Sequence, residues 1–222
     1  MRSAILFDLD GTLTNTDPIH FAVWRDVLRP YGLDFDRSFY DAKFSGRLNV
    51  DILSDILPQL SAEEAKALSD RKEAWFRERA ASELVPLVGL LDLLHWTEEA
   101  GVYRGIVTNA PAANANFVID ALNLRSWFPV IVIAEQLAQG KPHPLPYATG
   151  LERLEMAAER TIAFEDSVSG IQSAIGAGLF TVGITSSQTP ELLKAAGAQH
   201  TVPDFSDVTL APLLAKLSAD KL

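Results

Sequence analysis

Short runs of apolar, often β-branched residues alternate along the chain with segments whose apolar residues recur every three or four positions. The first pattern is typical of strands buried on both faces and the second of helices. The runs predict strands at 3–7, 103–107, 130–133, 161–164 and 180–184, with a weaker one at 200–202. The segments predict helices at 87–100, 113–122, 144–154 and 167–177, with a weaker one at 210–219. This alternation favours an α/β fold with a doubly wound, Rossmann-like parallel sheet.

One region interrupts the alternation. Residues 17–81 contain helical patterns at 19–31, 50–57 and 62–79 without a convincing strand. Ser61, with acidic residues at 63 and 64, is typical of the start of the last helix. We therefore expect an α/β core of residues 1–16 and 82–222, with an inserted all-helical cap domain of residues 17–81 acting as a lid.

The composition, 48% hydrophobic and 22% charged, is that of a protein with a packed core, and its charge argues against some classes of binding partner. Nineteen Lys and Arg against 29 Asp and Glu give a net charge of −10, which repels nucleic acid and anionic lipid. The absence of cysteine excludes disulfides, thiolate catalysis and cysteine-ligated zinc. The negative charge leads us to expect a protein that binds neither nucleic acid nor membranes. No targeting or membrane segment is recognisable, so we expect a cytoplasmic protein. We further expect a monomer or weak dimer.

The strongest chemical signal is Asp8-Leu9-Asp10-Gly11-Thr12, directly after the first predicted strand. Side chains two positions apart point the same way, so Asp8 and Asp10 project into one site at the end where open α/β sheets bind ligands. Gly11 lets the chain turn sharply, and Thr12 can satisfy backbone groups that the turn exposes. We also expect Thr12 to be a substrate-binding residue. The alternative is a strand-ending turn in which Asp is only a cap.

A second acidic pair, Glu165-Asp166, follows another predicted strand. Asp166 or Ser167 could simply cap the helix that begins there. Together with Asp8 and Asp10, however, the pair would bring four carboxyl groups to the ends of two parallel strands. Oxygen ligands without Cys or clustered His point to Mg²⁺ rather than zinc.

Two further segments complete this set. Thr108 and Asn109 end the strand predicted at 103–107 and offer a hydroxyl, an amide and backbone N–H groups to a phosphate. Lys141 lies between Gly140 and Pro142, after the strand predicted at 130–133. A lone Lys is most often a solvated surface residue, but the rigid flanks and this position favour a placed cation.

The ordered set D-x-D-G-T, a strand ending in Thr, Lys-Pro and Glu-Asp resembles the haloacid dehalogenase-like superfamily, and the resemblance covers the whole chain. The helical insert at 17–81 is similar to that family's cap. Residues 20–24, the pair at 71–72 and residues 164–171 resemble the branch that holds β-phosphoglucomutases and sugar-phosphate phosphatases.

The resemblance implies a role for each acidic residue. Asp8 would attack phosphorus and become an aspartyl phosphate, and Asp10 would protonate the leaving oxygen and later activate water. Mg²⁺ would be held by the Asp8 side chain, the Asp10 backbone carbonyl and Asp166, with Glu165 as a further ligand or beside one.

The resemblance also assigns the remaining core residues. Thr108 and Asn109 would cradle the transferring phosphoryl group, and Lys141 would neutralise its charge and that of Asp8. Catalysis of this type rests largely on positioning and electrostatics.

In the cap, we expect substrate-binding residues. Gly46 and Arg47 lie in a loop where a guanidinium could clamp a phosphate or another substrate oxygen, and His20 and Lys72 could assist from helices. The alternatives are that Arg47 only pairs with acidic residues of the cap and that Lys72 is one more charge on a solvated helix.

The combined interpretation is a Mg²⁺-dependent phosphatase of a small phosphorylated metabolite, of the sugar-phosphate kind. A β-phosphoglucomutase-type isomerase is the alternative, and a non-catalytic binding protein is the third. Asn109-Ala110-Pro111 and the missing spacer between Gly46 and Arg47 depart from the mutase pattern and favour the phosphatase. The presence of Asp10 argues against dehalogenase activity.

Overall fold

The computed structural model describes residues 2–44 and 47–218. The chain divides into two compact units, one of Met1–Asn15 with Val85–Leu222 and the other of Thr16–Leu84. The first unit therefore comes from two separate stretches of sequence, and the second is inserted between them.

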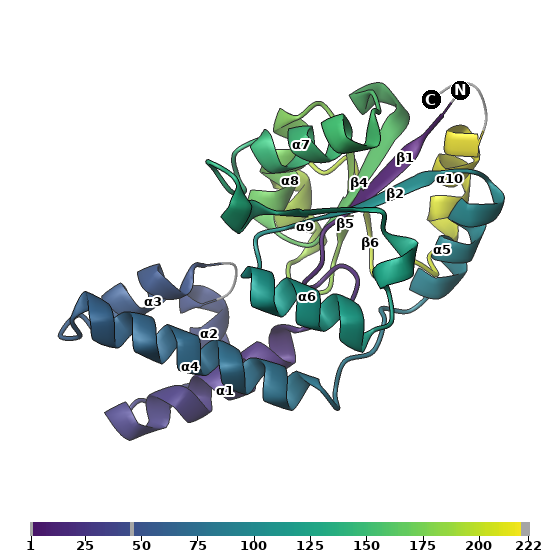
Figure 1. Ribbon diagram of the computed structural model, residues 1–222. Coiled ribbons are helices and arrows are strands. Elements are labelled where there is room, and N and C mark those ends of the chain that lie inside the picture. Colours follow the sequence, from purple (N-terminus) through teal and green to yellow (C-terminus); the bar gives the residue numbers. More distant parts are fainter. Residues whose placement is uncertain (1, 45–46, 219–222) are drawn as a thin grey trace. The chain divides into compact units, whose positions relative to one another are not determined.

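A six-stranded parallel sheet forms the centre of the first unit (Figure 1). Its strands run in the order β3-β2-β1-β4-β5-β6, so β1 lies inside the sheet, between β2 and β4. This order confirms the predicted α/β class with a doubly wound sheet. The strands are β1 (Ala4–Phe7), β2 (Tyr103–Thr108), β3 (Val130–Ile133), β4 (Thr161–Glu165), β5 (Phe180–Ile184) and β6 (His200–Val202).

Helices cover both faces of this sheet. Figure 1 shows α7 and α8 on one face and α5 and α10 on the other. The α-helices of this unit are α5 (Leu90–Glu99), α6 (Ala112–Ala121), α7 (Leu145–Leu154), α8 (Val168–Gly176), α9 (Pro190–Ala195) and α10 (Ala211–Ser218). Short 3₁₀ turns lie at Arg125–Trp127, Ala134–Gln136, Ala158–Arg160 and Val208–Leu210.

The strands are apolar on both sides because both sides are buried. On one face Leu6, Val107 and Ala163 pack with residues of α7 and α8. On the other face the rings of Phe7 and Phe164 stack with centroids 5.5 Å apart. Phe7 and Phe164 are also register partners, so the residues that follow them leave β1 and β4 side by side.

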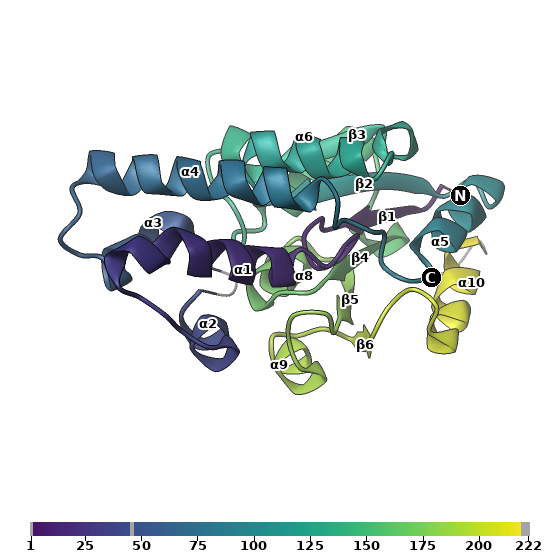
Figure 2. The same ribbon diagram turned by 90° about the horizontal axis from the view of Figure 1, so that it is seen from below.

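The second unit contains only helical elements in its described residues, 16–44 and 47–84. Its longest pair, α1 and α4, pack along each other (Figure 2). Ser61 and Glu64 form a capping box that starts α4, as the sequence predicts. The helices are α1 (Asp17–Leu28), α2 (Arg37–Lys43), α3 (Asn49–Ile56) and α4 (Ala62–Ala80), with a 3₁₀ turn at Arg29–Tyr31.

Hydrogen bonds join the two segments at which the chain leaves and re-enters the first unit. Thr14 Oγ1 donates a hydrogen bond to the Val85 carbonyl at 2.7 Å. Leu87 N–H donates to the Leu13 carbonyl at 2.8 Å. The loop that follows β1 and the segment that precedes α5 thus lie against each other within the first unit.

Most predicted elements form within a few residues of their expected ends, and the differences have local reasons. Helix α5 begins at Leu90 rather than 87 because Gly89 takes a left-handed backbone conformation with φ of 77°. Helices α2 and α9, of seven and six residues, were not predicted. Residue 219, the expected end of the last helix, lies outside the described residues. None of the described helices is long and apolar enough to cross a membrane.

Candidate active site

Asp8 directly follows β1, at the position that corresponds to Glu165 on the neighbouring strand β4. Its backbone N–H donates to the Phe164 carbonyl at 2.9 Å, which extends the ladder between the two strands by one residue. Because side chains alternate along a strand, Asp8 points to the same side as Leu6, toward the face that α7 and α8 cover. The fold therefore places this carboxylate in a buried position, 7% exposed.

The turn after Asp8 requires glycine. Gly11 has φ of 81°, and its N–H donates to the Thr14 carbonyl at 2.7 Å. A Cβ at Gly11 would lie 2.0 Å from Oδ2 of Asp166. Glycine therefore serves both the turn and the close approach of a carboxylate from β4. Asp10, half-buried, lies within this turn and pairs with Thr14 through its backbone.

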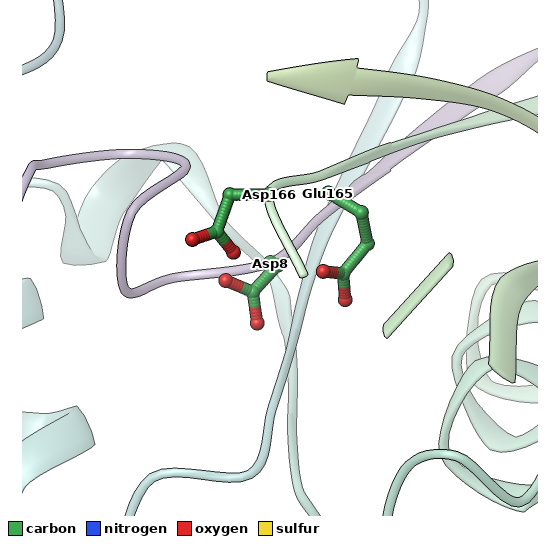
Figure 3. A group of neighbouring side chains, drawn as sticks. All are labelled: Asp8, Glu165 and Asp166. Carbon is green, nitrogen blue, oxygen red and sulfur yellow. The ribbon is translucent and has the colours of Figure 1, made fainter. Parts of the chain in front are cut away.

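Three buried carboxylates converge beyond β1 and β4 (Figure 3). Asp8, Glu165 and Asp166 each offer one oxygen, and these three oxygens lie within 4.8 Å of one another. Figure 3 shows the Asp8 carboxylate between the other two. Such a set of buried anions requires protons or cations to offset its repulsion.

Lys141 supplies one cation. Its Nζ donates to Oδ1 of Asp8 at 2.6 Å, to Oε1 of Glu165 at 2.5 Å and to the carbonyl of Val107 at 2.7 Å. These contacts use all three N–H donors of the ammonium. The side chain is 2% exposed, so the interpretation of Lys141 as a placed cation, rather than a solvated one, agrees with the structure.

One lysine does not balance three carboxylates. Burial raises the pKa of Asp8 to about 7, although the Lys141 ammonium lowers it. Burial, with the charges of Asp8 and Glu165, also raises the pKa of Asp166 well above its usual range. The site thus holds more negative charge than its own cation offsets, which is the electrostatic setting of a divalent-cation site.

Glu165 is fixed on both of its oxygens. Tyr147 of α7 donates its hydroxyl to Oε1 at 2.8 Å, and Ser167 donates its hydroxyl to Oε2 at 3.2 Å. A Cβ at Gly170 would lie 2.0 Å from this carboxylate, so only glycine fits there. Ser167 also caps α8, since its Oγ accepts from Gly170 N–H at 3.0 Å. The expected cap and the acidic pair therefore occur together.

Asn109 contacts the main chain of Lys141. Its Oδ1 accepts from Lys141 N–H at 2.9 Å, and its Nδ2 donates to the Lys141 carbonyl at 3.1 Å. Both ends of the amide are thus engaged in holding the Lys141 loop. Thr108, buried at the end of β2, accepts a hydrogen bond from Ala110 N–H at 2.9 Å.

The expected role of Thr12 in its turn is wrong. Its side chain is fully buried, and among the described residues its Oγ1 has no hydrogen-bond partner. The backbone of Thr14 provides the contact within the turn instead, because its carbonyl accepts from Gly11 N–H at 2.7 Å.

The candidate residues of the second unit contact other residues of that unit. Lys72 is buried, and its Nζ contacts Nδ1 of His20 at 2.9 Å and Oε1 of Glu73 at 2.8 Å. The alternative of a solvated Lys72 is therefore wrong. Burial, with the charge of Lys72, holds the pKa of His20 well below its usual range, so His20 is a neutral acceptor for Lys72.

Arg47 makes the contact that its alternative interpretation describes. Its guanidinium pairs with Oδ2 of Asp55 at 2.6 Å and donates to the carbonyls of Lys43 and Asp51. Gly46, the other residue expected in this loop, lies outside the described residues.

Three residues around the site were not singled out from the sequence. Tyr147 fixes Glu165, Gly170 leaves room for the Glu165 carboxylate, and Ser187 contacts Asp166. Tyr147 lies in the first turn of α7, six positions after Lys141, and this spacing gives no signal of its contact with Glu165. Ser187 belongs to a different loop and carries no local signal.

Comparison with known proteins decides the family. The sequence model of the haloacid dehalogenase-like hydrolases matches residues 5–184. The chain belongs to this family. The match begins within β1 and runs to the end of β5, and thus covers every residue of the carboxylate site and its lysine.

Individual relatives agree with this family membership. A validoxylamine A 7'-phosphate phosphatase of Streptomyces hygroscopicus subsp. limoneus is 30% identical over 94% of this chain and 96% of its own length. A β-phosphoglucomutase of Bacillus subtilis (strain 168) is 30% identical over 93% of this chain and 92% of its own. The crystal structure of a family IA hydrolase from Entamoeba histolytica superposes with a TM-score of 0.87 at 28% identity, covering 99% of this chain and 100% of that one.

These matches confirm the resemblance stated from the sequence. They support a phosphoric monoester hydrolase as the enzyme class and the branch that includes phosphoglucomutase-like relatives.

Proposed function

We propose that this hydrolase is a Mg²⁺-dependent phosphatase of a small phosphorylated metabolite, of the sugar-phosphate class, that works through an aspartyl phosphate on Asp8. The observation that carries the proposal is the buried Asp8 carboxylate, bound to Lys141 at 2.6 Å and adjacent to Asp166 and Glu165. A nucleophile held among fixed charges is the arrangement that phosphoryl transfer requires.

In the first step an oxygen of Asp8 attacks phosphorus and the bond from phosphorus to the substrate oxygen breaks. Asp10 donates a proton to that leaving oxygen. Lys141, which already contacts Asp8, offsets the charge carried by the nucleophile and the phosphoryl group. Asn109 acts here through Lys141, because its amide binds both the backbone N–H and the backbone carbonyl of that residue.

In the second step water attacks the aspartyl phosphate. Asp10 takes the proton from this water, the bond between phosphorus and the Asp8 oxygen breaks, and inorganic phosphate leaves. Asp8 is regenerated as a carboxylate, and Asp10 is protonated for the next cycle. The two aspartates of the D-x-D motif therefore have separate roles, one nucleophilic and one acid–base.

The residues present fit Mg²⁺. Asp8 and Asp166 would hold it with the backbone carbonyl of Asp10, and Glu165, fixed by Tyr147 and Lys141, would lie beside this set. All of these groups are hard oxygen ligands. Burial and the neighbouring carboxylates raise the pKa of Asp8 and of Asp166, so a bound cation would stabilise their ionised forms. The cation, when bound, supplies Lewis-acid stabilisation of charge on the phosphoryl oxygens.

We further propose that the inserted helical unit is the cap and that it selects the substrate. Its candidate contacts are Arg47 and the buried Lys72–His20 pair. A guanidinium is suited to a second anionic or hydroxyl group of the substrate, and the ammonium of Lys72, held by His20 and Glu73, would add positive charge for an anionic substrate group.

A β-phosphoglucomutase-type isomerase is the second candidate, and one observation favours it. The Bacillus subtilis relative that carries that name is as similar over nearly the whole chain as the phosphatase relative is. A mutase would pass the phosphoryl group from Asp8 to a second sugar hydroxyl instead of to water.

The deciding experiment is a screen of phosphorylated metabolites with Mg²⁺ that records both phosphate release and isomerisation. Phosphate release from several substrates supports the phosphatase. Conversion of β-glucose 1-phosphate to glucose 6-phosphate without phosphate release supports the mutase, and no turnover supports a binding protein. Asp8→Asn should lower turnover by at least about a thousandfold while the fold is kept; retention of more than a few per cent would contradict the covalent route.

A further inference from the structure

The loop after β5 carries two serines that the mechanism above does not use. Ser186 and Ser187 follow β5 after Thr185 and are half-buried. In the sheet β5 neighbours β4, so this loop lies beside the residues that leave β4. Both hydroxyls are directed at the candidate site rather than at their own loop.

Each hydroxyl reaches a different segment of the site. Ser187 Oγ lies 2.5 Å from Oδ2 of Asp166 and 2.9 Å from the Asp166 carbonyl. Ser186 Oγ donates to the carbonyl of Gly11. A single loop thus contacts the turn after β1 and the acidic residue after β4.

A serine hydroxyl has one proton, so Ser187 donates to one of its two acceptors at a time. The carboxyl oxygen is the nearer acceptor, and when Asp166 is ionised, as it is with a bound cation, a hydrogen bond to it is the stronger of the two. On its other side Oδ2 of Asp166 packs against Gly11. A Cβ added to Gly11 would lie only 2.0 Å from this oxygen. Oδ2 is therefore restrained from two directions, by Ser187 and by the glycine turn.

Restraint of one carboxylate oxygen fixes the other. Figure 3 shows one oxygen of Asp166 directed toward Asp8. Rotation of this carboxylate would break the Ser187 bond or drive Oδ2 into the Gly11 turn. Ser187 and Gly11 together thus set the orientation of the Asp166 carboxyl group relative to Asp8.

We infer that Ser187 is a positioning residue that orients the Asp166 carboxylate for a divalent cation. This inference rests on the proposed function only in that Asp166 is taken as a cation ligand. Partners of this kind, which hold a ligand without touching the cation, commonly change metal affinity by about ten- to a hundredfold when removed.

The test compares metal affinity across variants of the full chain. Ser187→Ala removes the hydroxyl, and Ser187→Thr keeps it. Thr185→Val is the matched control, because Thr185 lies in the same loop and its hydroxyl faces the Val202 carbonyl instead of the site. Mn²⁺ binding is followed by electron paramagnetic resonance and Mg²⁺ binding by calorimetry, without substrate.

We expect Ser187→Ala to weaken Mn²⁺ and Mg²⁺ binding about tenfold, with Ser187→Thr and Thr185→Val within about twofold of the wild type. In turnover assays, half-maximal activity should shift to higher Mg²⁺ by the same factor, with kcat largely recovered at saturation. If Ser187→Ala does not fold, Ser187→Val against Ser187→Thr makes the same comparison.

Equal cation affinity in Ser187→Ala and wild type would overturn the inference, even if the protein is a phosphatase. A wild-type chain that binds neither cation would overturn it as well. Conversely, tenfold weaker binding in a chain that turns over no phosphate ester would support Ser187 as a positioning residue and contradict the proposed function. The two failures are therefore distinguishable.

Discussion

Tyr147 and Lys141 donate to the same oxygen of Glu165, at 2.8 Å and 2.5 Å. The Lys141 ammonium also lies 5.1 Å from the centroid of the Tyr147 ring. One tyrosine therefore contacts the lysine through its face and the lysine's partner through its hydroxyl. Since Tyr147 is fully buried in α7, it links the position of Lys141 to the packing of that helix.

Tyr147→Phe separates these two contacts. The ring stays beneath Lys141, but Oε1 of Glu165 loses a donor, so Lys141 is less well fixed toward Asp8. We expect kcat to fall about three- to tenfold with KM nearly unchanged, and the free energy of unfolding to drop by about 1 kcal/mol. Steady-state kinetics and urea unfolding measure both. Tyr103→Phe, which removes a hydroxyl from a more exposed tyrosine of β2, is the control and should leave kcat unaltered. An unchanged kcat in Tyr147→Phe would show that Lys141 needs no such support.

The charge at Asp8 makes the metal-free protein less stable as pH rises. Its pKa is about 7 in the fold, above the value near 4 of an unfolded chain, so the folded state binds more protons between these two values. The stability associated with protonated Asp8 is therefore complete below about pH 4 and lost by about pH 7. Asp8→Asn, which stays neutral, should be more stable than wild type at pH 8 by on the order of 4 kcal/mol.

Urea unfolding in EDTA at pH 4, 6 and 8 measures this difference. The advantage of Asp8→Asn should be near zero at pH 4, grow toward pH 7 and level off above it, and effects of titrating groups away from the carboxylate cluster cancel in the comparison. An advantage that is constant across this range would contradict a raised pKa for Asp8.

Removal of Mg²⁺ should abolish activity reversibly. Asp166→Ala removes one of the three converging carboxylates and should weaken Mg²⁺ binding at least about tenfold, in addition to slowing turnover. Beryllium fluoride with Mg²⁺ should inhibit by imitating the aspartyl phosphate. Asp204→Ala removes a carboxylate outside the carboxylate cluster and serves as the control. Full activity in excess EDTA would rule out the proposed metal dependence.

Arg47→Ala distinguishes a substrate contact from a structural ion pair. If Arg47 orients a monophosphorylated substrate, KM should rise about tenfold while much of kcat remains, because one charge-assisted contact is lost. If its role is the pair with Asp55, only the melting temperature should change, and by little, since the Asp55 carboxylate is exposed. Lys66→Ala, which breaks an exposed pair with Asp70 in the same unit, is the control. Strong activation by glucose 1,6-bisphosphate, with isomerase activity lost in Arg47→Ala, would make the enzyme a mutase.

The strands and longer helices were predictable because each carries its own pattern, as the continuous apolar run of β3 illustrates. Helix α2 was not, because seven residues give fewer than two helical repeats, and its clearest signal is the Asp36 cap that accepts from Phe39 N–H. Helix α9 is shorter still.

The site was predictable in part for a related reason. Asp8, Lys141 and the Glu165-Asp166 pair lie in motifs that follow strands, and parallel strands bring such ends together. Tyr147 and Ser187 act through contacts between segments that a linear pattern does not join. Burial was also hidden, since nothing local to α4 distinguishes Lys72 from its solvated neighbours.

The hydrogen bonds from Thr14 to Val85 and from Leu87 to Leu13 make the inserted unit excisable in principle. They hold the two segments of the first unit that flank the insert next to each other. If the insert is deleted, a short Gly-Ser linker from Asn15 to Val85 therefore has little distance to span. The shortened chain should fold around the same sheet and keep its cation site, as circular dichroism and Mn²⁺ binding would show. It should also lose substrate selectivity, hydrolysing a small activated ester such as p-nitrophenyl phosphate relatively better than any sugar phosphate. An insert that can be removed in this way is also one that can be exchanged, and substrate choice could then be altered without altering the chemistry.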